Sequence, residues 1–124
     1  MSIFENTELD VRVSEKDGKI LASFTPPADF PAFRGHFPGN PILPGIAQIT
    51  LVQEILSLAM KKKLELTEIK RVKFLHPVSP GMGLHIQISL LPQGEHLLNT
   101  DASVTSNGDG KRIAALKLQF RETA

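Results

Sequence analysis

The stretch Arg34-Gly35-His36-Phe37-Pro38-Gly39-Asn40-Pro41-Ile42-Leu43-Pro44-Gly45 leads directly into an apolar run that extends from Ile46 to Met60. Its three prolines restrict their own φ angles and the conformation of the residue before each. Its three glycines permit turns and let a ligand or another backbone approach closely. We therefore expect a stiff loop that holds His36 beside the N-terminus of a helix, where it can act on a bound substrate.

The apolar spacing that follows the loop predicts a helix from Gly45 to about Lys62. Polar side chains recur at helical spacing and form one narrow stripe, made of Thr50, Glu54, Ser57 and Lys61. The rest of the helix surface is apolar, so we expect a mostly buried helix. Gln48 lies nearly opposite the polar stripe, and we expect it to need its own partner inside the protein. The run from Lys61 to Lys63 ends the helix, where cations suit the negative end of the helix dipole.

The remainder of the chain alternates apolar and polar residues, which predicts β-strands. Two strands, at about 9–13 and 20–24, precede the helix. Further strands are expected at 69–76, 84–90, 98–104 and 116–120, with a hairpin turn at Asn107-Gly108-Asp109-Gly110. One buried helix and about six strands predict an α+β fold in which an antiparallel sheet curls around the helix. Such a sheet leaves edges that an oligomer would cover.

Length and composition narrow the function further. The 124 residues predict a single domain spanning 1–124. With no cysteine, thiol nucleophiles, disulfides and Cys-based metal sites are excluded. A net charge of +1 does not suggest binding to nucleic acid. There is no targeting segment and no membrane-spanning run, so we expect a soluble cytoplasmic protein. His76, His85 and His96 lack metal-ligand spacing, and we expect neither a metal nor a cofactor.

Two segments resemble a known family. Residues 35–45 closely resemble the signature of the β-hydroxyacyl-(acyl carrier protein) dehydratases of fatty-acid synthesis, which have the hot-dog fold. Residues 72–81 resemble that family's second recurrent segment, a strand that ends in a Pro-Val-x-Pro-Gly turn. Together with the strand order, the resemblance covers about residues 9–121. It implies a hot-dog domain that removes water from a 3-hydroxyacyl thioester, carried by acyl carrier protein (ACP) or coenzyme A, to give a trans-2-enoyl thioester.

The resemblance also implies roles for individual residues. In the family, the histidine that matches His36 removes the α proton or otherwise assists elimination. The glycine that matches Gly45 offers its backbone amide to the thioester carbonyl, at a helix N-terminus that favours developing negative charge. We expect Phe37, Pro44 and Thr50 to contact the substrate as well.

The chain departs from the family at Thr50. The family places a Glu or Asp fourteen residues after the histidine, usually contributed by the partner subunit of a dimer, and uses it as the acid that helps the hydroxyl leave. A threonine hydroxyl is far too weakly acidic for that step. Three alternatives stay open. Glu54, one turn further along the same helix face, is a displaced catalytic acid; or a related subunit in a hetero-oligomer donates the missing carboxyl; or the protein binds acyl thioesters or assembles with a partner without eliminating water, or performs another thioester reaction such as hydrolysis. We expect the protein to form a homodimer or a higher homo-oligomer.

Basic residues offer one further expectation. The Lys61–Lys63 run, together with Arg71 and Lys73, is suited to meet an acidic acyl carrier protein or the phosphate of its pantetheine arm. The alternative is an ordinary solvated surface.

Overall fold

The computed structural model of the protein describes residues 9–14, 18–33, 42–94 and 96–123. Within these ranges, one helix, α1 (Gly45–Met60), packs against one six-stranded antiparallel sheet, and residues Pro31–Phe33 form a short 3₁₀ turn. The strands follow the order β1-β2-β4-β5-β6-β3 across the sheet. Their bounds are β1 (Asp10–Ser14), β2 (Lys19–Phe24), β3 (Lys63–Phe74), β4 (Leu84–Gln93), β5 (Leu97–Ser106) and β6 (Arg112–Thr123). The predicted α+β architecture is confirmed.

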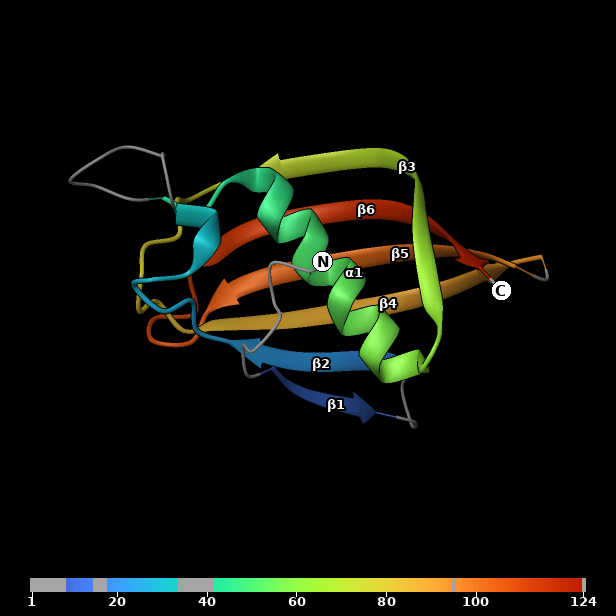
Figure 1. Ribbon diagram of the computed structural model, residues 1–124, viewed down its shortest axis with the longest axis horizontal. Coiled ribbons are helices and arrows are strands. Elements are labelled where there is room, and N and C mark those ends of the chain that lie inside the picture. The colour runs from blue at the N-terminus through green and yellow to red at the C-terminus, as the bar shows by residue number, and fades with distance from the viewer. Residues whose placement is uncertain (1–8, 15–17, 34–41, 95, 124) are drawn as a thin grey trace.

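The core lies between α1 and the face of the sheet that it crosses (Figure 1). Leu51, Val52, Ile55 and Leu56 of the helix are completely buried. Burial of each such side chain contributes about 1.5–3 kcal/mol. The helix is not covered all round, however, because Ile46 is 65% exposed and Leu58 is 50% exposed. These two apolar residues are exceptions within a helix that is otherwise mostly buried on its apolar surface, as expected.

The helix ends at Met60, and the chain reverses at Lys61 in the left-handed conformation, with φ 56°. The amide of Lys62 donates a hydrogen bond to the carbonyl of Ser57 at 3.3 Å. Strand β3 then begins at Lys63, six residues before the predicted start at Ile69. No glycine or proline separates the two elements, so the sequence carried no turn signal there.

Strand β3 is one edge of the sheet and bends around the C-terminal end of α1 (Figure 1). Its pairing with β6 shifts register between Leu66 and Glu68 and again between Ile69 and Arg71. Extra residues of this kind bend a strand and increase its twist. Near the end of β3, Val72 packs against the core, whereas Arg71 and Lys73 point away from the helix.

The predicted hairpin turn is confirmed. The turn at residues 107–110 joins β5 to β6, with the amide of Ser106 donating to the carbonyl of Lys111 at 2.8 Å. Phe30 and Phe33 are buried and stack edge to face, with centroids 6.2 Å apart. No helix in the described part of the chain is both long and apolar enough to cross a membrane.

Candidate active site

A cavity of about 290 Å³, which we call the helix cavity, opens at the N-terminus of α1. It is lined by residues 42–45, by Gln48 of α1 and by residues 74–77, which end β3 and begin the next loop. The two motif segments therefore meet here. The amide of Leu43 also donates a hydrogen bond to the carbonyl of Val78 at 2.8 Å, which joins the two segments directly.

The first turn of α1 leaves hydrogen-bond donors at this cavity. The residue before the helix is Pro44, which is extended (φ −66°, ψ 152°), and no side chain of the described residues caps the helix. The amide of Ala47 donates to the carbonyl of Pro44 at 3.0 Å. Helix geometry gives the amides of Gly45 and Ile46 no acceptor within the helix. These donors and the positive end of the helix dipole suit an oxygen that gains negative charge.

Gly45 is required here because another part of the wall comes very close. A Cβ atom at this position would lie 2.6 Å from both Cε2 and Cζ of the Phe74 ring. Phe74 is 48% exposed, and its ring forms the wall that faces the helix N-terminus. Any larger residue at position 45 would push the ring outward and change the shape of the cavity.

Gln48 contributes a buried polar group to the same cavity. Its side chain is only 3% exposed, and its Oε1 atom has no hydrogen-bond partner among the described residues. The predicted internal partner is therefore not found there. Gln48 lies three residues after Gly45, so the two share one face of the helix.

His76 is a second polar residue in the wall. Its Nδ1 atom lies 2.8 Å from the carbonyl oxygen of Arg112. Because a carbonyl only accepts, Nδ1 carries the hydrogen, and Nε2 is the acceptor when the ring is neutral. The spacing of His76 in the sequence spoke against a metal ligand and indicated no other role for it. Among the described residues, no group of three or more His, Cys, Asp or Glu side chains could hold a metal.

The structure brings only some of the predicted site residues together. Pro44 and Gly45 line the helix cavity, but Thr50 and Glu54 do not. The Thr50 hydroxyl donates to the carbonyl of Ile46 at 2.9 Å, as its helical position predicts. Glu54 lies about 13.5 Å along the helix from Gly45, at 1.5 Å per residue. Their roles in the reaction stay predictions, as do those of His36 and Phe37, which lie outside the described residues.

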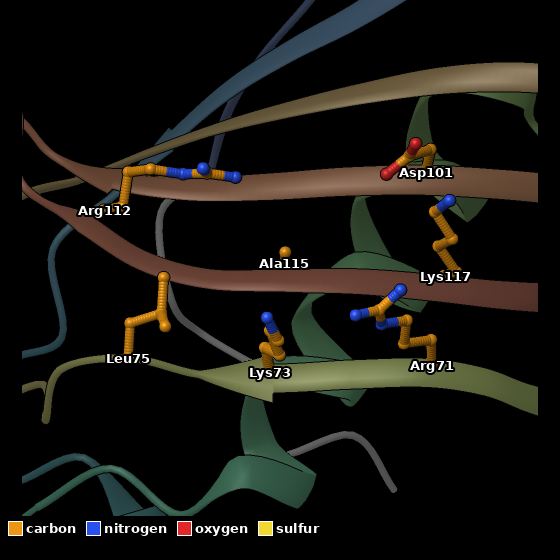
Figure 2. Close-up of a pocket in the computed structure, with 7 residues that line it drawn as sticks. All are labelled: Arg71, Lys73, Leu75, Asp101, Arg112, Ala115 and Lys117. Carbon is orange, nitrogen blue, oxygen red and sulfur yellow. The ribbon is translucent and has the colours of Figure 1, made fainter.

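A second pocket, which we call the outer pocket, lies on the sheet face opposite α1 and measures about 390 Å³ (Figure 2). Four cations line it, namely Arg71, Lys73, Arg112 and Lys117. Asp101 is the one carboxylate among its described lining residues. Leu75 lines both this pocket and the helix cavity, so the two lie on either side of the end of β3.

One pair of cations in the outer pocket lies directly opposite across neighbouring strands. Arg71 of β3 is the register partner of Lys117 in β6, and Lys117 is in turn the partner of Asp101 in β5. Lys73 is opposite Ala115, whose small side chain leaves the pocket open. Like charges directly opposite one another destabilise a sheet. This arrangement is therefore suited to a bound anion.

Two carboxyl groups outside these cavities have lowered pKa values. A hydrogen bond from Lys62 at 3.0 Å is the main cause that lowers the pKa of Glu122. The pKa of Asp109 is lowered chiefly by a hydrogen bond from the backbone amide of Lys111. Neither group lines the helix cavity or the outer pocket.

Comparison with known proteins places the chain in a family. Residues 12–109 match the family model described as ApeI-like, ApeI dehydratase. The chain belongs to the ApeI-like dehydratase family. The matched range includes both motif segments that form the helix cavity, and it confirms the sequence resemblance to dehydratases.

Curated relatives agree with this assignment. The 3-hydroxyacyl-(acyl-carrier-protein) dehydratase FabZ of Rickettsia massiliae is 29% identical over 87 residues, which are 64% of this chain and 60% of that protein. The FabZ of Caulobacter vibrioides is 36% identical over 70 residues, which are 49% of this chain and 44% of that protein. The ApeI-like chain thus spans less than two thirds of the length of these relatives.

Solved structures show that the ApeI-like chain has the hot-dog fold. The dehydratase heterocomplex ApeI:P from Xenorhabdus doucetiae matches with a TM-score of 0.72 and 23% identity, over 93% of this chain and 95% of that chain. Thioesterase superfamily member 2 of Mus musculus matches with a TM-score of 0.71 and 19% identity, over 98% of this chain and 87% of that chain. The predicted hot-dog architecture is confirmed.

Proposed function

We propose that this ApeI-like protein is a cytoplasmic dehydratase that removes water from a 3-hydroxyacyl thioester, carried by ACP or coenzyme A, to give the trans-2-enoyl thioester. The observation that carries the proposal is the helix N-terminus at Gly45, which has no side-chain cap and opens into a cavity built from both dehydratase motifs. No metal or cofactor takes part in the proposed reaction.

The chemistry follows from the donors at the cavity. The thioester carbonyl accepts a hydrogen bond from the amide of Gly45, which stabilises the enolate-like charge that develops on the oxygen. His36, nine residues before Gly45, removes the α proton. The electrons of that C–H bond form the new C=C bond as the C3–O bond breaks. The departing hydroxide takes up a proton and leaves as water.

The proton for the departing hydroxide needs a donor from a second subunit. Within one chain, the Thr50 hydroxyl already donates a hydrogen bond to the backbone carbonyl of Ile46. Glu54 lies two and a half turns along the helix from Gly45. We propose that Glu54 of a second copy, or a carboxyl from a related subunit, completes the site. The exposed apolar residues Ile46, Leu58 and Ile69, together with the long free edge of β3, support such a partner.

The proposed function is tested by supplying purified protein with 3-hydroxyacyl thioesters of several chain lengths. We expect the enoyl product and water, detected by mass spectrometry of the thioester. A folded protein that binds these thioesters but leaves them unchanged would instead be an acyl-thioester-binding module.

Thioester hydrolysis is a second candidate, because the same Gly45 amide would stabilise the oxyanion formed when water attacks the carbonyl. Neither Thr50 nor Glu54 is among the described residues that line the helix cavity, and hydrolysis, unlike dehydration, does not need an acid at these helix positions. Release of a free thiol, measured in the same reaction mixtures, distinguishes hydrolysis from dehydration. We expect the enoyl product to exceed the free thiol.

Substitutions at the two helix positions test the source of the acid. We expect Glu54→Gln to lower the dehydration rate by about 10²–10⁴-fold, because a general acid typically contributes that much. The matched control is Asp109→Asn, in the turn between β5 and β6 and away from both cavities, which should leave the rate unchanged. Turnover rates of purified variants are the measurement.

The second test adds Thr50→Glu to the Glu54→Gln variant. If Glu54 is a displaced acid, a carboxyl at position 50 should restore the rate that Glu54→Gln loses. An unchanged rate in Glu54→Gln alone would remove Glu54 as the acid and leave the related-subunit alternative.

The outer pocket is proposed to hold the phosphate of the carrier arm, since four cations surround it and Leu75 connects it to the helix cavity. We expect Arg71→Glu combined with Lys73→Glu to raise KM at least tenfold for ACP or coenzyme A substrates. The KM for an N-acetylcysteamine thioester, which has no phosphate, should stay the same. Added salt should weaken the effect, because it screens exposed charges.

The matched control for this charge reversal is Lys19→Glu on β2, which does not line the pocket. An equal rise in KM for the thioester without phosphate would show that the substitutions act on the fold or on the acyl site. In that case the outer pocket would not be the carrier site.

A further inference from the structure

One buried side-chain atom at the helix cavity lacks a hydrogen-bond partner among the described residues, the Oε1 atom of Gln48. Gln48 is 3% exposed, and Oε1 is buried with no hydrogen bond from any described residue. A buried acceptor that lacks a donor costs stability. The surrounding positions of α1 are apolar, including Leu51 and Val52, so an apolar side chain would suit the fold better.

The described walls offer no side-chain donor to this atom. Apart from Gln48, the one polar side chain among the described lining residues is His76. Its Nδ1 hydrogen is already directed to the carbonyl of Arg112 at 2.8 Å. A donor for Oε1 is therefore best supplied by whatever occupies the cavity.

The helix fixes how Gln48 and Gly45 are related. They are three residues apart, so they lie on one face and differ by about 4.5 Å in height along the axis. Helical side chains lean toward the N-terminus, which brings the Gln48 amide back toward Gly45. An occupant that accepts from the Gly45 amide can therefore also donate to Gln48.

We propose that Gln48 is a specificity-determining residue that accepts a hydrogen bond from the 3-hydroxyl of the substrate while its thioester carbonyl binds the Gly45 amide. The inference rests on the proposed function of the helix cavity as the thioester site. The 3-hydroxyl is a donor on the second carbon from the thioester carbonyl carbon, so a single acyl group carries both the acceptor for Gly45 and the donor for Gln48. An acyl group without the hydroxyl leaves Oε1 unpaired and is bound less well.

The test uses amide analogues, in which NH replaces the thioester sulfur so that no elimination takes place. One analogue carries the 3-hydroxyacyl group and the other the saturated acyl group of equal length. We expect the wild-type protein to bind the hydroxyl analogue at least tenfold more tightly, measured by calorimetry. Gln48→Leu should remove this preference by weakening the hydroxyl analogue about tenfold, with the saturated analogue changed by less than twofold.

Thermal unfolding gives an independent readout. We expect Gln48→Leu to raise Tm by about 2–5 °C, because it removes a buried acceptor that has no donor. Gln48→Met, closer in shape to glutamine, is the second variant and should behave in the same way. A stable variant that has lost the hydroxyl preference would show that Gln48 serves the ligand and not the fold.

Each other outcome overturns the inference. Equal weakening of both analogues would mean that Gln48 shapes the cavity without contacting the hydroxyl. A lowered Tm in both variants would mean that Oε1 has a partner in the free protein. If both analogues bind to the wild type without preference, only the role of Gln48 fails. If neither binds, the proposed acyl site fails with it.

Discussion

Replacing His36 with alanine is expected to lower kcat/KM for dehydration by about 10²–10⁴-fold, the contribution typical of a positioned general base. The α proton of a thioester is removed only slowly by water, and the Gly45 amide stabilises the enolate-like charge without accepting the proton. His36 comes nine residues before Gly45 in the sequence, and we expect the three prolines of this stretch to hold it near the helix cavity. Initial rates at several substrate concentrations measure the loss.

The control for this variant is His85→Ala on β4, which lies outside the helix cavity. It should retain full activity. Binding of the 3-hydroxyacyl amide analogue by His36→Ala should stay within a few fold of the wild type, because the carbonyl and hydroxyl partners remain. Full turnover in His36→Ala would rule out this histidine as the base.

Gly45→Ala is expected to lower the dehydration rate by about 10²-fold. The new Cβ atom would stand 2.6 Å from the ring of Phe74, so the ring must move from its place in the cavity wall. Displacement of a reacting group by about 1 Å can cost 10²-fold in rate. Phe74 is half exposed, so the ring can turn outward and the fold should survive. Turnover rates measure the change in the cavity wall, and Tm shows whether the fold has been destabilised as well.

A double-variant cycle tests that explanation. Phe74→Leu shortens the side chain that meets the new Cβ, so Gly45→Ala with Phe74→Leu should recover at least tenfold of the lost rate. Gly108→Ala is the control substitution, because a Cβ there meets nothing within 4 Å, and it should be silent. Independent, additive losses at positions 45 and 74 would show that the contact with the ring is not the cause.

Local patterns in the sequence predicted most of the fold. Alternation in residues 84–90 and helical spacing after Gly45 are properties of neighbouring residues, and both elements formed where expected. The hydrogen bond from Thr50 to Ile46 was predictable for the same reason, since it stays within one helical turn. The early start of β3 at Lys63 was missed because the reversal at Lys61 uses a lysine in the left-handed conformation, which leaves no glycine or proline signal.

The candidate site was predicted less completely because it depends on distant segments. The motif resemblance indicated Gly45 and Pro44, which do line the helix cavity. From the sequence, Gln48 was interpreted as a structural residue and His76 as unsuited to bind a metal. Their shared cavity could not be predicted, because it forms only when residues 74–77 fold against the start of α1. A signal was present for Gln48, a glutamine on the apolar side of a buried helix. The outer pocket likewise needed three strands to bring its charges together.

We expect the two register shifts in β3 to limit aggregation at this edge of the sheet. A flat twelve-residue edge that carries Ile69 would accept almost any extended chain and could grow into fibrils. The bends restrict pairing to a strand with matching curvature, such as the equivalent strand of another hot-dog subunit. The edge therefore favours a closed, finite assembly over open-ended polymerisation, and substitutions that straighten β3 should threaten solubility before they threaten folding.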